Sequence, residues 1–422
     1  MARAIALILD GLRRDLISPE TTPNLVRFAD KASRFAAHRS VFPSATRVVS
    51  AAFATGCQPG RNGLRGNTVA LRDNGRLALF DVGKPEFFET KRRLTGATLT
   101  MPTMAERLAG CGGVVVFNNV SPGAAYAHDP DGHGTIYHRA GSRGPGFEPV
   151  AEPLDIKSGI DGDRTMAARF IDEVVNGDAA LGVLWLSEPD TVQHSVPLGS
   201  PAHLRVLREA DAIAGEVMAA VAARDEDILL IVGSDHGHQS VGEIVDIAAF
   251  LAAKGLLEPG DDIVIAPNGT GAVIYVGPGH AERIAALHAV IASAPWAGAV
   301  YAGSRLAEIG LEATGGLAIA VSMRSRELTN IYGVPGISAA VKPAAGKPDR
   351  LGCGQHGGLG TYEQSPFLMI SGRGFAPGIL RGEATSIVDL APTILAHLGR
   401  PRTDLDGREL QVTSEPDGDQ RP

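Results

Sequence analysis

Acidic and histidine side chains occur in three short motifs of this chain, and their types suit metal binding. The motifs are Asp10-Gly11, Asp190-x-x-x-His194 and Asp235-His236. Carboxylate oxygens and imidazole nitrogens together are typical ligands of zinc or manganese, whereas calcium prefers oxygen alone. Each motif also has a structural explanation. An aspartate after a strand often forms a turn or caps a helix, and residues four apart can form a surface pair.

A further candidate ligand, His356, lies in a glycine-rich loop in the last quarter of the chain. A single loop histidine is more often an ordinary loop residue. Three aspartates and three histidines together are harder to explain structurally, because buried carboxylates are costly without cations. Six protein ligands are enough for two divalent ions, and the mixed set favours Zn²⁺, with Mn²⁺ as the alternative.

The hydroxyl group best placed to act as a nucleophile belongs to Thr46, which lies between Pro43 and an apolar run that ends at Gly56. This run predicts a helix that begins near Thr46. Backbone N–H groups at a helix start favour a bound anion and a developing alkoxide. A hydroxyl becomes a nucleophile when a metal ion stabilises its alkoxide. The alternative is that Thr46 or Ser44 only caps the helix.

Two side chains close to these motifs keep two interpretations each. Arg47 follows Thr46 directly, and it would either contact the substrate or cap its own loop. His238 would either orient a metal-bound neighbour through a hydrogen bond or face solvent. Trp185 and Trp296 are interpreted as core residues.

The polar motifs are positioned by short apolar runs, which predict buried strands. The runs are Ala4–Leu9, Gly113–Phe117, Gly182–Leu186, Ile228–Val232 and Phe367–Ile370. Predicted helices alternate with them, at Pro23–Ala37, Met101–Ala109, Asp163–Asn176, Pro201–Ala223 and Ile387–His397. This alternation predicts an α/β fold with a mainly parallel central sheet flanked by helices. Because ligands bind at the carboxyl ends of parallel strands, we expect Asp10, Asp190 and Asp235 to meet at one edge.

The stretch 242–347 has a different pattern and predicts an inserted α+β cap subdomain. It contains the segment Asp246–Lys254, a predicted helix at Ala281–Ser293, and predicted strands at Ala272–Val276 and Ala318–Ser322. The segment Pro343–Pro348 is interpreted as the return linker. Residues 1–241 and 348–422 would then form the catalytic core. The polar tail Ser414–Pro422 is expected to be frayed.

Composition excludes several classes of protein. The chain has 422 residues, of which 44% are hydrophobic, so it can bury a large core and is not globally disordered. Its 52 glycines follow no Gly-X-Y period, which excludes collagen. The net charge of −8 argues against binding to a nucleic-acid polymer. A small anionic substrate still fits, because a bound metal ion can reverse the local field.

The predicted location is the cytoplasm, without attachment to a membrane. The first apolar run ends at Asp10 and is too short for a secretion signal, and no apolar stretch is long enough to span a membrane. The three cysteines, Cys57, Cys111 and Cys353, form no disulfide or metal-binding motif, which fits a reducing compartment. A homodimer is compatible with the sequence, which does not specify the oligomeric state.

The ordered set of motifs resembles the alkaline phosphatase superfamily, in its nucleotide pyrophosphatase/phosphodiesterase branch, which includes phosphonoacetate hydrolase-like relatives. The resemblance rests on Asp10, Thr46, Thr55-Gly56, Asn67, Asp190-x-x-x-His194, Ser234-Asp235-His236-Gly237 and His356-Gly357, in this order. The C-terminal Asp389–Gly399 and Asp406-Gly407-Arg408 also resemble the closing helix and loop of the family. The resemblance covers both ends and the middle of the chain and leaves the insert unmatched.

The resemblance implies two metal ions and a covalent intermediate. One ion would be held by Asp190, His194 and His356. The second would be held by Asp10, Asp235, His236 and the oxygen of Thr46. Thr46 would form a phospho-threonine that water later hydrolyses, and Asn67 would donate to a phosphoryl oxygen. Because no Cys-x-Pro-x-Arg arrangement surrounds Thr46, a sulfatase is disfavoured.

The expected function is hydrolysis of a phosphodiester or nucleotide pyrophosphate bond in a small phosphorylated substrate. One alternative is a phosphonate hydrolase that cleaves a C–P bond. Another is a phosphomutase or phosphotransferase, in which an acceptor hydroxyl intercepts the phospho-enzyme before water does. A binding protein without activity is disfavoured, because every predicted ligand and Thr46 are present. The leaving group is not specified by these motifs.

Overall fold

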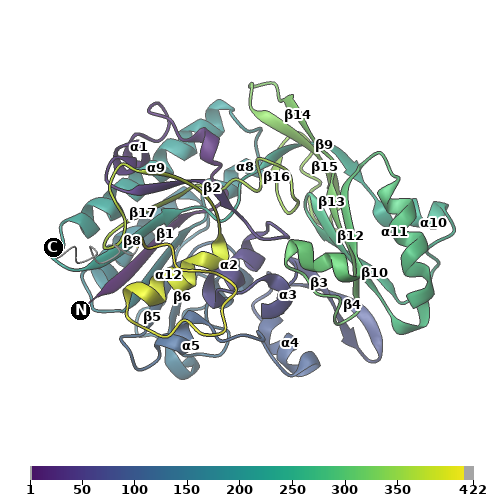
Figure 1. Ribbon diagram of the computed structural model, residues 1–422, viewed down its shortest axis with the longest axis horizontal. Coiled ribbons are helices and arrows are strands. Elements are labelled where there is room, and N and C mark those ends of the chain that lie inside the picture. Colours follow the sequence, from purple (N-terminus) through teal and green to yellow (C-terminus); the bar gives the residue numbers. More distant parts are fainter. Residues whose placement is uncertain (1, 413–422) are drawn as a thin grey trace, which may run out of the picture.

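A large sheet forms the centre of one of the two lobes of the molecule, and the computed structural model describes residues 2–412 (Figure 1). Its strands are β1 (Arg3–Leu9), β2 (Ser33–Arg39), β5 (Val114–Asn118), β6 (Thr135–Tyr137), β7 (Leu181–Leu186), β8 (Ile228–Gly233), β17 (Leu368–Ser371) and β18 (Leu380–Ser386). The strand order is β18-β2-β17-β8-β1-β7-β5-β6. Neighbouring strands are parallel, except that β17 is antiparallel to both β8 and β2. The predicted α/β fold with a mainly parallel sheet is therefore confirmed.

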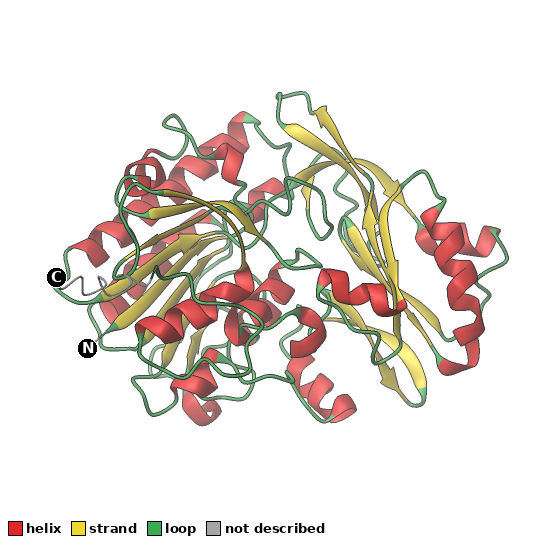
Figure 2. Cartoon of the chain, viewed as in Figure 1, coloured by secondary structure: helices red, strands yellow, loops and turns green. Residues whose placement is uncertain are grey.

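Helices cover both faces of this sheet, because its central strands are apolar on both sides (Figure 2). Along β1, Leu7 and Leu9 belong to the core on one face, whereas Ala6 and Ile8 belong to the core on the other. The first core includes α1 (Pro23–Ala29), α7 (Ile160–Phe170) and α9 (Pro201–Ala222). The second core includes α2 (Thr46–Thr55), α5 (Met104–Leu108), α6 (Pro122–Tyr126) and α12 (Leu390–His397).

The second lobe is built from two smaller sheets that carry helices on one side (Figure 1). In order across the first sheet, the strands are β10 (Ile263–Asn268), β11 (Gly271–Val276), β13 (Leu317–Met323) and β12 (Ala297–Ala302). Across the second they are β14 (Ser325–Thr329), β15 (Pro335–Val341), β9 (Gln239–Val245) and β16 (Gly354–Gln355). Helices α10 (Ile247–Ala253) and α11 (Ile284–Ala292) pack into a core that contains Trp296.

A two-stranded ribbon connects the lobes. It consists of β3 (Thr68–Asp73) and β4 (Arg76–Asp81), and it lies between α3 (Pro59–Asn62) and α4 (Phe87–Thr95) in the chain. Both strands contact β10 of the second lobe. Ala70 and Leu77 of the ribbon share a small core with Val273 and Leu317 of the second lobe.

The helix predicted over Pro23–Ala37 is wrong in its second half. The helix ends at Ala29, and β2 begins at Ser33. Ser33 and Phe35 are buried while Arg34 between them is partly exposed, which is the alternation of a strand rather than of a helix. The predicted helix Met101–Ala109 is shorter in the structure, since α5 spans only Met104–Leu108.

The remaining predictions concern the domain division, the C-terminal tail, the two tryptophans and membrane spans. The division into a core and an insert at 242–347 stays a prediction, and the tail Ser414–Pro422 lies outside the described residues. Trp185 and Trp296 are both buried, as predicted. Within residues 2–412, every helix is too short or too polar to cross a membrane.

Candidate active site

Three loops bring the predicted acidic ligands together, because they follow three neighbouring strands. Asp10 follows β1, Asp190 begins α8 (Asp190–Gln193) after β7, and Asp235 and His236 follow β8. In the sheet β1 lies between β8 and β7, and all three run in the same direction. Their carboxyl ends therefore form one edge, where ligands of parallel sheets bind.

His356 reaches the same edge from the opposite direction. It lies in the loop that leads toward β17, and β17 is antiparallel to β8. The beginning of β17 is therefore at the edge where the parallel strands end. His356 Nδ1 donates to the carbonyl oxygen of Ser44, at 2.7 Å, which leaves Nε2 with its lone pair toward the site.

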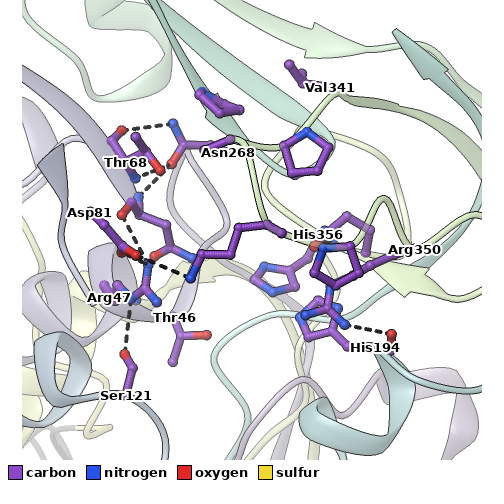
Figure 3. Close-up of a pocket in the computed structure, with 18 of the residues that line it drawn as sticks. Thr46, Arg47, Thr68, Asp81, Ser121, His194, Asn268, Val341, Arg350 and His356 are labelled. Carbon is purple, nitrogen blue, oxygen red and sulfur yellow. Dashed lines mark hydrogen bonds and ion pairs between the residues drawn. The ribbon is translucent and has the colours of Figure 1, made fainter. Parts of the chain in front are cut away.

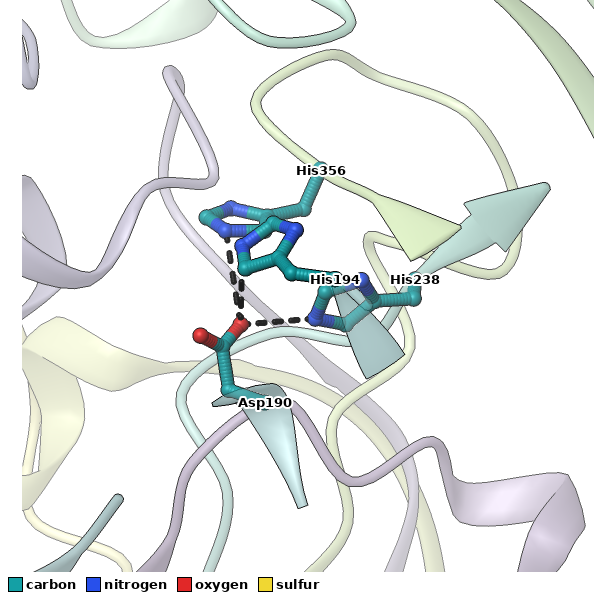
Figure 4. Close-up of side chains that lie close together, drawn as sticks. All are labelled: Asp190, His194, His238 and His356. Carbon is teal, nitrogen blue, oxygen red and sulfur yellow. Dashed lines mark hydrogen bonds and ion pairs between the residues drawn. The ribbon is translucent and has the colours of Figure 1, made fainter. Parts of the chain in front are cut away.

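The first cluster of ligand atoms contains Asp190, His194, His238 and His356 (Figure 4). One ligand atom from each side chain lies within 4.8 Å of all the others. Asp190 Oδ1 is 2.7 Å from Nε2 of His238 and 3.5 Å from Nε2 of both His194 and His356. His194 Nδ1 donates to the carbonyl oxygen of Gly354, at 3.0 Å. His238 is fully buried, so its interpretation as a solvent-facing residue is wrong.

The second cluster lies beside the first and shares Asp190 with it. Asp10, Asp190 and His236 offer ligand atoms within 4.8 Å of one another. Nε2 of His236 is also 3.1 Å from Oδ2 of Asp235 and 3.6 Å from Oδ1 of Asp10. The structure thus brings together all the predicted acidic and histidine ligands.

The carboxylates of Asp10 and Asp235 each use one oxygen and leave the other unpaired. Oδ2 of Asp10 accepts from Nε1 of Trp185, and Oδ1 of Asp235 accepts from the backbone N–H of Gly11, both at 3.0 Å. Oδ1 of Asp10 and Oδ2 of Asp235 are buried and accept no hydrogen bond from the described residues. Buried unpaired carboxylate oxygens beside imidazole nitrogens suit divalent cations, so the residues fit metal binding.

The pKa shifts of the residues in the two clusters also suit a bound cation. Burial raises the pKa of Asp10 well above its ordinary value, and repulsion from Asp235 and Asp190 adds to this. Burial would also raise the pKa of Asp190, but His194 and His238 outweigh it and hold that pKa well below the ordinary value. Burial lowers the pKa of His238 to about 3, which keeps this imidazole neutral. A cation would offset the repulsion among the carboxylates.

Thr46 is the first residue of α2, and its side chain faces the second cluster. Its Oγ1 lies 3.0 Å from Nε2 of His236. The residue that caps α2 is Ala45, whose side chain makes no capping hydrogen bond. Ser44 instead donates from Oγ to the carbonyl oxygen of Gly358, at 2.9 Å. Neither Thr46 nor Ser44 therefore caps the helix, and the alternative interpretation of these residues is wrong.

A cavity of about 470 Å³ opens onto Asp190, His194 and His356 of the first cluster, whereas Asp10, Asp235 and His236 are buried and do not line it (Figure 3). Thr46, Arg47 and Asn67 line it together with His194 and His356. Oδ1 of Asn67 accepts from the backbone N–H of Arg47, at 3.3 Å, so its Nδ2 is the group left to donate.

The Arg47 guanidinium is fixed by loops on either side of it. Nε donates to Ser121 Oγ at 3.0 Å, and Nη1 donates to the carbonyl oxygen of Asn67 at 3.1 Å. Nη1 also pairs with Asp81, at 3.2 Å. Arg47 therefore lines the cavity and ties loops together, while its contact with a substrate stays a prediction.

Several residues that hold the loops of the site in place were not predicted from the sequence. Glu363 is fully buried, and its carboxylate accepts from the backbone N–H groups of Gly358 and Gly360, both at 2.9 Å. It holds the loop that carries His356. Asn268 of β10 accepts from the backbone N–H of Asn67, at 2.5 Å. The glycine-rich loop around His356 was the only local signal for Glu363, and Asn268 had none.

The comparison with protein families agrees with this geometry. The family described as type I phosphodiesterase / nucleotide pyrophosphatase matches residues 4–301. The chain belongs to this family. It is thus a hydrolase of the alkaline phosphatase superfamily, as the motifs had suggested. A search among curated proteins found no match.

Solved structures share the fold over almost the whole chain. Murine ectonucleotide pyrophosphatase / phosphodiesterase 5 is 18% identical, with a TM-score of 0.68 over 96% of this chain and 97% of that one. An inactive threonine-to-alanine variant of the murine protein, in complex with AMP, is 17% identical with a TM-score of 0.69 over the same shares. Phosphonoacetate hydrolase from Sinorhizobium meliloti 1021, in complex with phosphonoformate, is 15% identical. Its TM-score is 0.65, over 94% of this chain and 95% of that one.

Proposed function

We propose that this hydrolase cleaves a phosphodiester or nucleotide pyrophosphate bond of a small substrate through a phospho-threonine on Thr46. The observation that carries the proposal is the place of the Thr46 hydroxyl. It starts α2, lies 3.0 Å from Nε2 of His236 in the second cluster, and lines the same cavity as Asp190, His194 and His356 of the first. The inactive threonine-to-alanine variant of the murine relative supports a threonine nucleophile.

The proposal includes two divalent cations, with zinc favoured over manganese. Asp190, His194 and His356 would hold one ion. Asp10, Asp235, His236 and Thr46 would hold the other. Bound there, two ions would stabilise the threonine alkoxide and the leaving oxygen during an in-line displacement. The buried, unpaired oxygens of Asp10 and Asp235 support this assignment.

The chain's own residues account for the rest of the reaction. Thr46 Oγ1 attacks phosphorus, a new P–O bond forms, and the bond to the leaving oxygen breaks with its electron pair on that oxygen, which takes up the proton that Thr46 loses. Asn67 donates from Nδ2 to a phosphoryl oxygen, because its Oδ1 is occupied by the backbone of Arg47. Water then attacks phosphorus, the bond to Thr46 breaks, and Thr46 regains its proton.

Replacement of Thr46 tests the mechanism directly. Thr46→Ala with its full metal content should lose at least about 1,000-fold in kcat, because the nucleophile is absent while the cavity remains. Thr46→Ser retains the hydroxyl and should keep measurable turnover, with a phosphorylated serine detectable by mass spectrometry after acid quenching. Full turnover of a metal-loaded Thr46→Ala variant would exclude a phospho-threonine.

A phosphonate hydrolase is the second candidate, and the cavity lining favours it. Arg47, Lys347 and Arg350 all line the cavity around Thr46 and could hold a second anionic group such as a carboxylate. Phosphate release from phosphonoacetate, compared with hydrolysis of bis-p-nitrophenyl phosphate by the same zinc- or manganese-loaded sample, separates the two candidates. A phosphotransferase would instead yield a phosphorylated alcohol when an acceptor is added.

The predicted cytoplasmic location remains part of this proposal. Cys57, Cys111 and Cys353 are all unpaired in the described structure, which supports a reducing compartment. Labelling of the three thiols in protein taken directly from cells would test this point. A homodimer also remains a prediction, and sedimentation of the metal-loaded protein would test it.

A further inference from the structure

A second cavity, of about 620 Å³, lies between the two lobes and shares no lining residue with the cavity around Thr46. Helix α4 and strand β3 form one side, and the end of β11 with the loop 314–316 forms the other. Three cationic side chains, Arg65, Arg72 and Lys91, line it, and no carboxylate does, although Arg72 pairs with Asp262 at 3.4 Å. An excess of basic side chains is unexpected in a chain with a net charge of −8.

Lys91 carries a buried charge that is not in direct contact with a carboxylate. The residue is only 5% exposed, and its Nζ donates to the carbonyl oxygens of Thr98 at 2.7 Å and Ala97 at 3.3 Å. An ammonium has three donors, so one remains for another partner. Within residues 2–412, Lys91 forms no ion pair. Burial and the nearby charge of Arg65 lower the pKa of Lys91 to about 8, although the carboxylate of Asp131 opposes this shift.

Arg65 donates hydrogen bonds only to uncharged acceptors among the described residues, although the carboxylate of Glu312 lies near it. Its guanidinium donates to the carbonyl oxygen of Thr314 at 3.1 Å, to the hydroxyl of Thr314 at 2.5 Å, and to the carbonyl oxygen of Gly60 at 3.3 Å. Its Nε is buried and has no partner among the described residues. The Lys91 ammonium thus keeps one unused donor, and the charge of Arg65 lies near it in the same cavity.

The rest of the lining is largely apolar. Val69 and Leu71 of β3, Leu94 of α4 and Val276 of β11 contribute hydrocarbon surface. Tyr275, which is also buried, contributes a hydroxyl group. A ligand that fits this lining needs an oxyanion at one end and a short apolar part at the other.

We propose that this cavity binds a small organic monoanion, with its carboxylate or phosphorus oxyanion between Lys91 and Arg65 and its hydrocarbon part against Leu71 and Val276. Such a ligand would contact both lobes at once. The proposal does not depend on the hydrolase reaction, because Lys91 and Arg65 are outside the active site.

Calorimetric titration of the metal-loaded protein tests the proposal, with hexanoate, hexylphosphonate and the uncharged hexanamide as probes. Hexanoate or hexylphosphonate should bind with a stoichiometry of one, hexanamide should not bind, and the tighter anion identifies the preferred head group. Lys91→Met should weaken anion binding at least about tenfold, since a charge-assisted hydrogen bond is lost. Arg65→Gln should have the same effect, which keeps the test valid if Lys91→Met does not fold.

A matched control variant and a crystal soak that locates the bound ligand complete the test. Arg93→Gln changes an exposed arginine of the same helix and should leave the affinity unchanged. Crystals soaked with 6-bromohexanoate should show the anomalous signal of bromine beside Leu71 and Val276. Equal affinities of the wild type, Lys91→Met and Arg65→Gln, or a bromine signal only at the metal ligands, would overturn the proposal.

Discussion

Two kinds of histidine with little exposed surface differ in their hydrogen bonds. His194 and His356 tie Nδ1 to a backbone carbonyl oxygen and present Nε2 to Asp190. His128 lies in the core, where its ring packs edge-on against aromatic neighbours and its Nε2 has no partner in the described structure. The first group is suited to ligand binding, whereas His128 can only make the fold sensitive to acid.

His128 should weaken the fold as the pH falls. Burial lowers its pKa to about 3 from the ordinary 6.5, so between these values the unfolded chain binds a proton that the folded chain does not. Stability is therefore lost as the pH falls from above 6.5 toward 3. In His128→Phe, the loss of unfolding free energy between pH 7 and pH 5 should be smaller by about 2 kcal/mol.

Urea denaturation of the metal-loaded protein at both pH values measures this difference. His288→Gln, which changes a partly exposed histidine of α11, is the control and should behave as the wild type. If His128→Phe loses as much stability as the wild type, then burial of His128 does not contribute to acid sensitivity.

The candidate metal ligands could be predicted from the sequence, but the residues that hydrogen-bond to them could not. Asp10, Asp235 and His236 stand at the ends of apolar runs, which is a local signal. The hydrogen bond from Trp185 to Asp10 joins residues 175 positions apart. Such a contact depends on which strands are neighbours in the sheet, and no local pattern contains that information.

At the scale of elements, the direction of β17 decides how the site is completed. A parallel strand in its place would start at the far edge of the sheet and would carry the preceding loop away from Asp190. Because β17 is antiparallel to β8, the loop with His356 starts from the edge where the acidic ligands lie. The sequence predicted a strand over Phe367–Ile370 but contained no signal for its direction.

Glu363 should control the position of this loop. Its carboxylate accepts from Gly358, Gly360, the Gln239 amide and the Thr270 hydroxyl, whereas the amide of a glutamine would direct N–H groups at some of these donors. Glu363→Gln should therefore lower the free energy of unfolding by about 2–4 kcal/mol. It should also weaken the binding of one metal ion.

Metal titration followed by urea denaturation measures both effects. Glu327→Gln is the matched control, because Glu327 is an exposed glutamate that accepts only from Tyr362. Unchanged metal affinity in Glu363→Gln would show that the loop holds His356 in place without this carboxylate.

At the scale of the whole molecule, the smaller lobe steadies the active site of the larger one. Asn268 of β10 accepts from the backbone N–H groups of Asn67 and Thr68, at 2.5 and 3.3 Å. Its Nδ2 donates to the carbonyl oxygen of Thr68, at 3.3 Å. The two lobes therefore meet at the residue that we expect to donate to the phosphoryl group.

Asn268→Ala should reduce kcat/KM by about 10- to 100-fold, because small displacements of a catalytic group are costly. The metal content should be unchanged, since Asn268 is not among the proposed ligands. Asn268→Asp keeps the accepting oxygen and should recover most of the activity. Steady-state kinetics with bis-p-nitrophenyl phosphate measure all three proteins, and an Asn268→Ala variant as active as the wild type would contradict this role.

The pairing of strands in the smaller lobe could not be predicted from the sequence. Strands at Ala272–Val276 and Ala318–Ser322 were predicted, and they correspond to β11 and β13. The pairing of β9 with both β15 and β16 joins segments that are about 100 residues apart, and turn signals do not specify such pairs.

The late arrival of His356 along the chain has a consequence for biosynthesis. Asp10 and Asp190 are synthesised before His356, whose loop leads to β17, a strand that the chain supplies after β1, β7 and β8. Until His356 has been made, the carboxylates of Asp10 and Asp190 lack their final neighbour. The nascent chain would therefore expose this edge of the sheet until β17 inserts, so that a complete metal site would form only after that step.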